Sequence, residues 1–250
     1  MRRARLTHRS SRRFAAACAV ALALALTGCG GDEGSGGGEE SSSPLSQEQA
    51  DTALLTEGNL GEGFVANPDD GDDDEAEELG CLTFIDALGE SEDAATTAKI
   101  DYEFQNDMGN PAVLSSVESY DDTDSADSAV DALRDELDGC DAVDYEDEDG
   151  ITFSLDVTSD DEQTADGTDD QLNVSAAGTI GSGEIELPFT LELSIAQVGQ
   201  HLTIVGVTDL GSHSSDAVDD YTQIAVDRLA AVADGDEPAE TTAPAPSPTS

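Results

Sequence analysis

Basic residues are scarce in this sequence, and tryptophan is absent altogether. Its 250 residues include only nine Lys and Arg, against 57 Asp and Glu. Six of the nine lie in residues 1–13, so the rest of the chain carries only Lys99, Arg134 and Arg228 and has a formal charge of −54. Nucleic-acid binding requires Lys and Arg that neutralise phosphates. The composition therefore excludes nucleic acid as a partner, and the charge opposes adsorption to anionic lipid.

A hydrophobic run long enough to span a membrane is also missing near the N-terminus. Residues 14–26 are uncharged and apolar, but they number only 13, whereas a membrane-spanning helix needs roughly 20 residues. Six arginines precede this run, and the small residues Thr27 and Gly28 follow it before Cys29. This order is typical of a secretory signal peptide, which we expect to comprise residues 1–28.

The motif Leu26-Thr27-Gly28-Cys29 resembles the lipobox of bacterial lipoproteins. The resemblance implies diacylglycerol on the Cys29 thiol, cleavage before this residue, and acylation of the new amine by a fatty acid such as palmitate. Because two or more acyl chains hold a protein stably on a membrane, we expect a lipid anchor at the outer face of the cell membrane. An ordinary secretory signal with a chance cysteine is the alternative. The general and the twin-arginine export routes both stay open, since Ser11-Arg12-Arg13-Phe14 partly matches a twin-arginine signal.

Composition divides the rest of the chain into a tether, a domain and a tail. Residues 29–45 are mainly Gly, Ser and Glu, as in flexible linkers. Residues 235–250 end in a stretch of Pro, Ala, Thr and Ser, which predicts a disordered tail. Residues 46–234 are numerous enough for one extracytoplasmic domain with a sizeable core.

Alternating apolar and polar residues predict strands in this domain. The clearest run, residues 184–195, keeps a period of two over twelve residues. Pro188 lies on its polar side, which favours an edge position because proline cannot donate to a ladder. The last four predicted strands are joined by short connections and should form an antiparallel meander. The six predicted strands lie around residues 100–104, 113–120, 151–157, 172–180, 185–195 and 202–207.

Helical periodicity appears on both sides of these strands. Residues 124–138 place Ala126, Val130 and Leu137 on one stripe, and residues 215–233 have a similar apolar face. A shorter helix is predicted over residues 46–55, and another is expected after Cys81. The combination predicts an α+β fold, with a central antiparallel sheet of about six strands and three or four flanking helices.

Two cysteines remain once the leader, which contains Cys18, and the lipidated Cys29 are set aside. Cys81 and Cys140 are therefore expected to form a disulfide, as two thiols in an exported domain do. Closing a loop of about 60 residues contributes roughly 4 kcal/mol in the chain-entropy model. A metal site or a redox role is disfavoured, because the sequence lacks paired Cys-x-x-Cys spacing.

Sequence motifs for enzymatic chemistry are absent. The chain has no Gly-x-Ser-x-Gly, no Gly-x-Gly-x-x-Gly and no phosphate-binding loop. Outside the leader the histidines are His201, at a predicted strand start, and His213, in a Gly- and Ser-containing loop. Either could serve as a base, but with no nucleophile motif nearby we expect both to be exposed to solvent. The sequence thus predicts a protein that is not an enzyme, with no catalytic residue and no cofactor.

Acidic clusters raise the question of divalent cations. An EF-hand register around Gly150 fails, because Tyr145 takes its first position and Asp156 its last. Residues 69–74 are rich in Asp but lack that register, so they are either a weak, non-selective cation site or a charged loop. The general acidity has two readings: a solvated surface suited to high salt, or clusters that bind divalent cations. No residue is predicted as a specific metal ligand.

The order of these features resembles one known family. After the lipobox come Ala53-Leu54-Leu55-Thr56, a turn ending in Gly63-Phe64, two cysteines around a strand and a helix, and a meander containing Gln197-Val198-Gly199-Gln200. Over roughly residues 50–233 the chain resembles the PknH-type extracellular domain of actinobacteria, found in a receptor kinase and in stand-alone lipoproteins. The resemblance implies a non-enzymatic sensor-like domain with a ligand cleft. Better-known members carry two disulfides, whereas this chain can form one.

Three functions follow as hypotheses. The first is a membrane-anchored, non-enzymatic, sensor-like domain that binds a small-molecule solute or a component of the cell envelope. The second is an acidic structural or cation-binding surface protein, with weak divalent cations as partners. The third is a hydrolase whose residues escape recognition.

Overall fold

The structure is a computed structural model that describes residues 43–67, 81–82, 85, 88–106, 110–146, 150–183, 185–211 and 216–244. The expected leader, the lipidation site Cys29 and most of the expected tether lie outside these residues, as do His213 and residues 69–74. The described residues belong to one unit, residues 40–250. Its elements, in chain order, are α1 (Gln47–Ala53), α2 (Glu57–Leu60), β1 (Phe64–Asn67), β2 (Thr96–Phe104), β3 (Ala112–Ser119), α3 (Thr123–Leu137), β4 (Ala142–Glu146), β5 (Ile151–Asp160), β6 (Asp170–Ser182), β7 (Ile185–Val198), β8 (His201–Asp209) and α4 (Asp216–Ala233).

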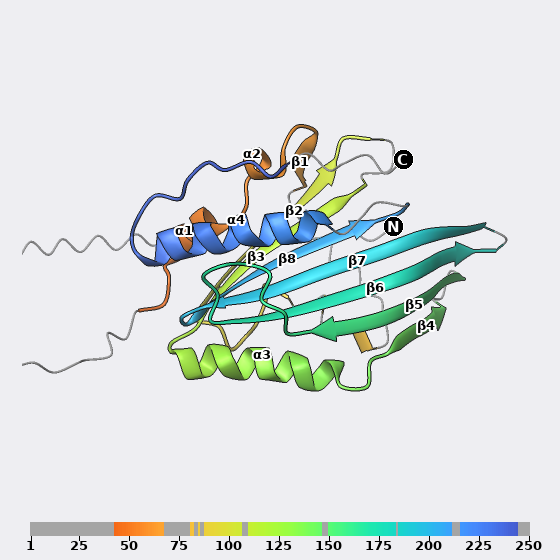
Figure 1. Ribbon diagram of the computed structural model, residues 1–250, viewed down its shortest axis with the longest axis horizontal. Helices are drawn as coiled ribbons and strands as arrows, with labels where there is room; N and C mark the ends of the chain where they lie inside the picture. The colour runs from red at the N-terminus through yellow and green to blue at the C-terminus, as the bar shows by residue number, and fades with distance from the viewer. Residues whose placement is uncertain are drawn as a thin grey trace, which may run out of the picture. The chain divides into compact units, whose positions relative to one another are not determined.

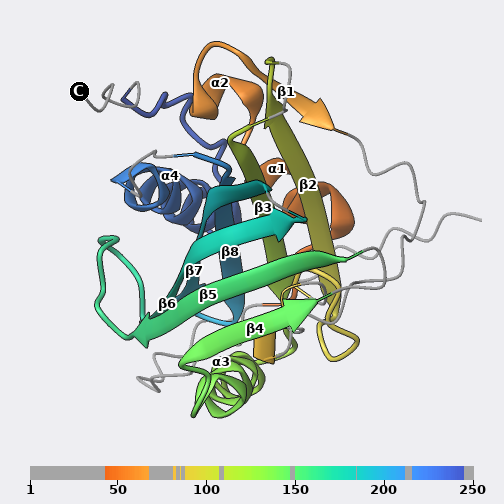
Figure 2. The same ribbon diagram turned by 90° about the vertical axis from the view of Figure 1, so that its right-hand side faces the viewer.

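The eight strands form one antiparallel sheet in the order β1-β2-β3-β8-β7-β6-β5-β4 (Figures 1 and 2). Strands β4 to β8 are a meander, and the earlier strands continue the sheet from β8 through β3. The α+β fold and the antiparallel meander are confirmed. The sheet has two strands more than expected, β1 and β4, which have only four and five residues. Strands this short contain too few alternations to give a periodic signal.

Pairing along β7 agrees with the position expected for Pro188. This residue pairs with Thr179 of β6, whereas the pairing of β7 with β8 begins only at Thr190. At Pro188, β7 therefore has a neighbouring strand, β6, on one side only. The missing N–H of proline affects the strand pairing at this position alone.

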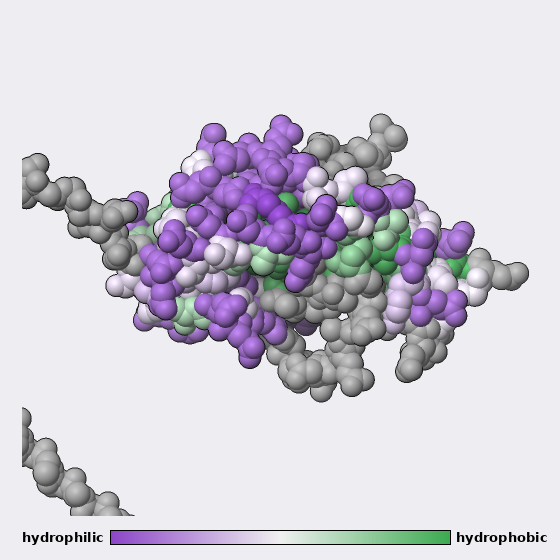
Figure 3. Space-filling view, turned by 90° about the horizontal axis from the view of Figure 1, so that it is seen from below, coloured by the Kyte–Doolittle hydropathy of each residue, from purple (hydrophilic) through white to green (hydrophobic). Residues whose placement is uncertain are grey.

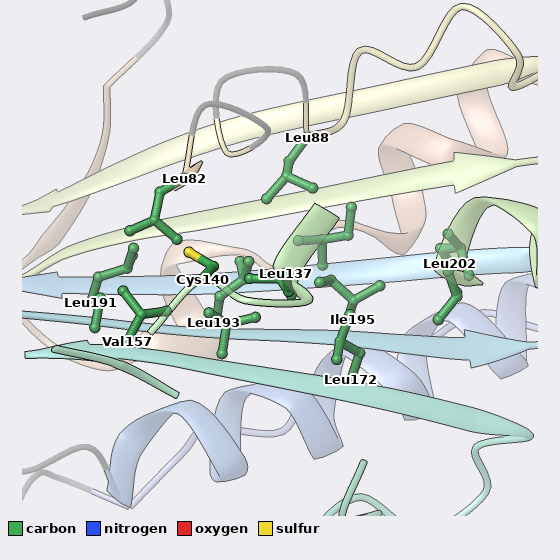
Figure 4. Close-up of a cluster of buried hydrophobic side chains, with 14 of the residues drawn as sticks. Leu82, Leu88, Leu137, Cys140, Val157, Leu172, Leu191, Leu193, Ile195 and Leu202 are labelled. Atoms are coloured by element: carbon green, nitrogen blue, oxygen red, sulfur yellow. The ribbon is translucent and has the colours of Figure 1, made fainter. Parts of the chain in front are cut away.

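Both faces of the sheet are covered (Figures 1 and 2). On one face, alternate residues of β6, β7 and β8 pack toward α3 and the segment around Leu82 and Leu88. Figure 4 shows Leu191, Leu193 and Ile195 of β7 in this cluster, close to Cys140. On the opposite face, α1 covers β2 and β3, and α4 covers β8 and β7. The sheet therefore has two cores, one under α3 and one under α1 and α4.

Helix α4 is joined to α1 by a buried arginine. The Arg228 side chain is 4% exposed. Its Nε donates to the carbonyl of Leu54 at 2.8 Å, and its Nη2 donates to the carbonyl of Thr52 at 2.7 Å. These carbonyls belong to the last turn of α1, where no further helical N–H can reach them. Arg228 thus satisfies the end of one helix from the middle of another.

Residues 235–244, the start of the expected disordered tail, have defined contacts in the structure. The Ala243 N–H donates to the Asn59 carbonyl at 2.8 Å, and the Asn59 side-chain amide donates to the Thr241 carbonyl. Ala243 itself is 8% exposed, within the core under α4. Backbone hydrogen bonds to α2 hold this segment, which its composition could not indicate.

Helices α1, α3 and α4 correspond to the helices predicted over residues 46–55, 124–138 and 215–233. The α-helix expected after Cys81 is not found in the part of this segment that the structure describes, where Cys81, Leu82 and Ile85 lie in 3-10 turns. Only seven residues separate Cys81, which is fixed by its disulfide, from Gly89, which is fixed by contacts with β3. A helix so short gains little from its own hydrogen bonds.

Candidate ligand-binding site

Helix α3 lies along the sheet and has a pocket on each flank. Its apolar residues Ala126, Val130 and Leu137 are buried against the strands. At its N-terminus the Asp122 carboxylate accepts hydrogen bonds from the Ser125 side chain and N–H, which lower the pKa of Asp122. Toward its C-terminus Arg134 donates to Asp170, at the start of β6, at 2.7 Å. The N-terminus of the helix is therefore capped and its C-terminal half is joined to β6, and the outward surface over it is mainly hydrophilic (Figure 3).

A disulfide fixes the segment that faces α3. Cys81 and Cys140 are bonded, with 5.8 Å between their Cα atoms, as expected from the sequence. Cys140 follows α3 directly, and Leu82, next to Cys81, is fully buried in the core under α3. The disulfide therefore ties the start of this segment, at Cys81, to the end of α3.

The same segment is fixed at its other end by Gly89. Its φ of +78° is one that L residues rarely adopt, and a Cβ here would lie 2.6 Å from the Cβ of Ser116 on β3. The Gly89 N–H donates to Glu118 Oε1 at 2.9 Å. A residue with a side chain would therefore push this loop away from the sheet.

The larger pocket, called the first pocket below, lies between α3 and residues 88–93 and has a volume of about 920 Å³. One flank of α3 lines it through residues at helical spacing. Its acidic residues come from the loop, from β3 and from α3: they are Asp93, Glu118, Asp122, Asp124 and Glu136. None of the described residues that line it is Lys, Arg or His. Apolar side chains such as Leu88 and Leu133 complete the lining.

Glu118 and Tyr120 form a buried pair in this pocket. Glu118 is 5% exposed and Tyr120 is 1% exposed. The Tyr120 hydroxyl donates to Glu118 Oε2 at 2.5 Å. Burial raises the pKa of Tyr120, and the hydrogen bond to the Glu118 carboxylate raises it further. Tyr120 therefore stays protonated at neutral pH and donates to Glu118. Within the described residues, the carboxylate has hydrogen bonds from Tyr120 and Gly89 but no ion pair with a cation.

His201 is buried, so the expectation that it is exposed is wrong. It is 3% exposed, its Nδ1 shares a hydrogen bond of 2.8 Å with Ser119 Oγ, and burial lowers its pKa. Ser119 Oγ also accepts from the Leu45 N–H. The chain segment before α1, which is 74 positions from Ser119 in sequence and farther still from His201, therefore covers this pair. Neither residue lines the pockets beside α3.

The acidity does not produce a ready metal site in the part of the chain that the structure describes. There, no group of three or more His, Cys, Asp or Glu side chains is arranged to hold a metal ion. Asp156, the last position of the failed EF-hand register, lies on β5 and is exposed. Among the same residues, no helix is both long enough and apolar enough to cross a bilayer.

Comparison with known proteins adds little. No protein-family model matches the chain, and no curated protein matches it. Among solved structures, the chain is similar to the extracellular domain of PknH from Mycobacterium tuberculosis, with 12% sequence identity and a TM-score of 0.45. The alignment covers 76% of this chain and 98% of that one. At this level of similarity, function has to be argued from this chain's own residues.

Proposed function

We propose that the chain is an exported bacterial lipoprotein, anchored through Cys29, whose domain binds a small, positively charged organic molecule in the first pocket. The lipobox-like motif supports the anchor. The buried Glu118 carboxylate supports the ligand class and is the observation that carries the proposal. Binding without chemical conversion is proposed because the described lining contains no histidine to activate its serines, and its cysteine is in a disulfide.

The charge of the first pocket favours a cation over an anion or a neutral sugar. Taking a carboxylate out of water is unfavourable unless a partner compensates for the lost hydration. Glu118 receives two hydrogen bonds from neutral donors, and the other acids of the lining add to the negative field. An anion would meet this field with no cationic side chain among the described lining residues to bind it. A cation would neutralise it.

The mixed lining favours an organic cation. Apolar residues such as Leu88, Ala129 and Leu133 can contact alkyl groups but offer nothing to a hydrated metal ion. A pocket of about 920 Å³ also lies within the range of small-molecule sites in proteins, roughly 300–1,000 Å³. The fitting ligand has an amine or quaternary ammonium head and a short apolar part.

Titration of the full chain, purified in a non-ionic detergent, with spermidine, choline and arginine amide tests the ligand class. Isothermal calorimetry at 150 mM salt should give saturable binding of at least one of them. Glu118→Gln keeps the shape of the side chain and removes its charge. We expect it to weaken binding at least tenfold, or about 1.4 kcal/mol.

Glu103→Gln is the matched control, because it removes the same charge from an exposed position on β2 and should change affinity less than twofold. Absence of binding for all three compounds would refute the ligand class. Equal affinities of the Glu118→Gln and Glu103→Gln variants would refute the site.

The anchor is tested separately. Cys29→Ser should move the chain from the membrane fraction to the soluble or secreted fraction of a bacterial host and abolish labelling by a palmitate analogue. An unchanged membrane fraction would contradict lipidation at Cys29, whatever the ligand result.

A further inference from the structure

A second pocket lies on the other flank of α3. It has a volume of about 590 Å³ and is bounded by the helix, by the start of β6, by the end of β7 and by the turn at Gly199. Residues 127 and 131 of α3 face it, whereas the first pocket is lined by residues 124, 128, 132 and 136. The two pockets therefore lie on different sides of the same helix. Its lining includes Asp127, Asp131, Asp169, Asp170, Gln197 and Gly199.

Gln197 brings a buried acceptor to this pocket. The side chain is 1% exposed. Its Nε2 donates to Asp127 Oδ1 at 2.6 Å and to the Gly199 carbonyl at 2.9 Å. Both amide hydrogens are thus used, which fixes the orientation of the amide, because turning it over would bring Oε1 against two acceptors. Its Oε1, buried as well, has no hydrogen-bond partner among the described residues. A buried acceptor of this kind is unfavourable unless a donor completes it.

The aspartates around Gln197 differ in their partners. Arg134 pairs with Asp170 at 2.7 Å and with Asp131 at 3.3 Å, and its hydrogen bond lowers the pKa of Asp170. Asp127 accepts from the neutral Gln197 amide, and Asp169 Oδ2 accepts from the Gly199 N–H at 2.7 Å. No ion pair to Asp127 or Asp169 exists in the part of the chain that the structure describes. Gln197 Oε1 and the carboxylates of Asp127 and Asp169 are therefore acceptors that a further donor can complete, and the aspartates of the lining make the pocket negative.

We propose that this second pocket binds a primary ammonium group, held by Gln197 Oε1 and by the carboxylates of Asp127 and Asp169. An ammonium group has three N–H donors and one positive charge, which match an orphan amide oxygen and two carboxylates without a cation. The described residues offer no cluster of three metal-ligating side chains, so an ammonium group fits better than a bare divalent ion. The proposal does not depend on the first pocket, which is lined by other residues.

The test uses two probes with the same charge. One is Nα-acetyl-lysine methylamide, which has a primary ammonium group, and the other is its Nε-trimethyl derivative, which has no N–H to donate. Both are titrated into the full chain in non-ionic detergent, and binding is followed by calorimetry and by the NMR signals of the Gln197 side-chain amide. These signals are assigned as those that disappear in Gln197→Met. The primary amine should bind with saturation and shift them, and the trimethyl derivative should bind at least tenfold more weakly.

The double variant Asp127→Asn/Asp169→Asn removes the two unpaired charges and keeps an oxygen acceptor at each position. It should weaken binding of the primary amine at least tenfold. The matched control, Asp144→Asn/Asp156→Asn, removes the same number of charges from exposed positions on β4 and β5 and should change affinity less than twofold. Glu118→Gln should also leave this binding unchanged, so failure here can be told from failure at the first pocket.

Three results would overturn the proposal. The first is the absence of saturable binding, which would mean that water alone completes Gln197. The second is equal binding of the trimethyl derivative, which would reduce the site to a general negative field. The third is displacement of the amine by millimolar calcium chloride but not by sodium chloride of equal ionic strength, which would assign the pocket to a metal ion.

Discussion

Replacing Arg228 tests the joint between α1 and α4. Arg228→Met keeps a long side chain but removes the donors to the Leu54 and Thr52 carbonyls. The first of these hydrogen bonds is buried and the second is partly buried. A buried polar group left without a partner costs about 1–3 kcal/mol, so two carbonyls, one of them partly reached by water, should cost about 2–5 kcal/mol.

One gain reduces this loss. Arg228 Nη1 is buried with no hydrogen-bond partner among the described residues, and methionine removes that donor together with a desolvated charge. We therefore expect a net loss of about 2–4 kcal/mol. With a slope of about 2 kcal/mol per molar urea for a domain of this size, the unfolding midpoint should fall by about 1–2 M. Circular dichroism in urea at fixed salt measures it.

Lys99→Met is the matched control because it removes the same charge. Lys99 has an ion pair with Glu90 at 3.4 Å, and the Glu90 side chain is 60% exposed, so its loss should cost less than about 1 kcal/mol. Similar midpoints for Arg228→Met and Lys99→Met would show that loss of positive charge, and not the joint, determines the stability change, and would refute the reasoning.

Two further predictions concern stability. Burial lowers the pKa of His201 from its ordinary 6.5, so the unfolded state binds more protons than the folded state. The free energy of unfolding that neutral His201 maintains above about pH 6.5 is therefore lost as the pH falls below it. Between pH 7.5 and 5.5, wild type should lose more unfolding free energy than His201→Gln, by up to about 1.4 kcal/mol; parallel losses in urea titrations would contradict the burial. The Cys81→Ser/Cys140→Ser variant should lose about 4 kcal/mol, and calorimetry should show a melting temperature lower by about 8–16 °C; an unchanged melt would mean that the loop is held without the disulfide.

Long amphipathic segments were predictable from the sequence because the spacing of apolar residues within each segment indicates its secondary structure. Helix α3 and strand β7 are regular elements of 15 and 14 residues, and their apolar residues recur with the helical and the strand period, so the period alone identifies them. The disulfide was predictable for a different reason: only two thiols remain after the leader and Cys29. Strands β1 and β4 depend on neighbours in the sheet, and nothing within four or five residues reveals those neighbours.

Burial that comes from distant residues could not be predicted. His201 is covered through a contact between Ser119 and Leu45, and Ala243 is buried because Asn59 binds the backbone on both sides of Thr242. In each case the deciding partner is remote in sequence. A local reading assigns His201 to a strand end and Ala243 to a Pro-rich tail, and both positions look exposed.

Neither candidate pocket has a motif. The first depends on Gly89 approaching Glu118, and the second on Asp127 meeting Gln197, 70 positions later. Among 57 acids, the composition gives no reason to single out Glu118 or Asp127. Alternation within β3 and β7 offers one indirect signal, because Glu118 and Gln197 are polar residues within largely buried strand segments. Such residues need partners or ligands.

The few cations of the domain explain why both pockets are negative. Arg228 is used at the joint of α1 and α4, Arg134 pairs with three aspartates, and Lys99 lies beside Glu90. No further Lys or Arg follows the leader, so any concave surface beside α3 is acidic by default. The sign of the charge alone therefore cannot make either pocket selective. Selectivity has to come from the groups whose geometry is fixed, namely the Glu118–Tyr120 pair in one pocket and Gln197 Oε1 in the other. For this reason the two lysine probes have the same charge and differ only in the N–H donors that Gln197 Oε1 could accept.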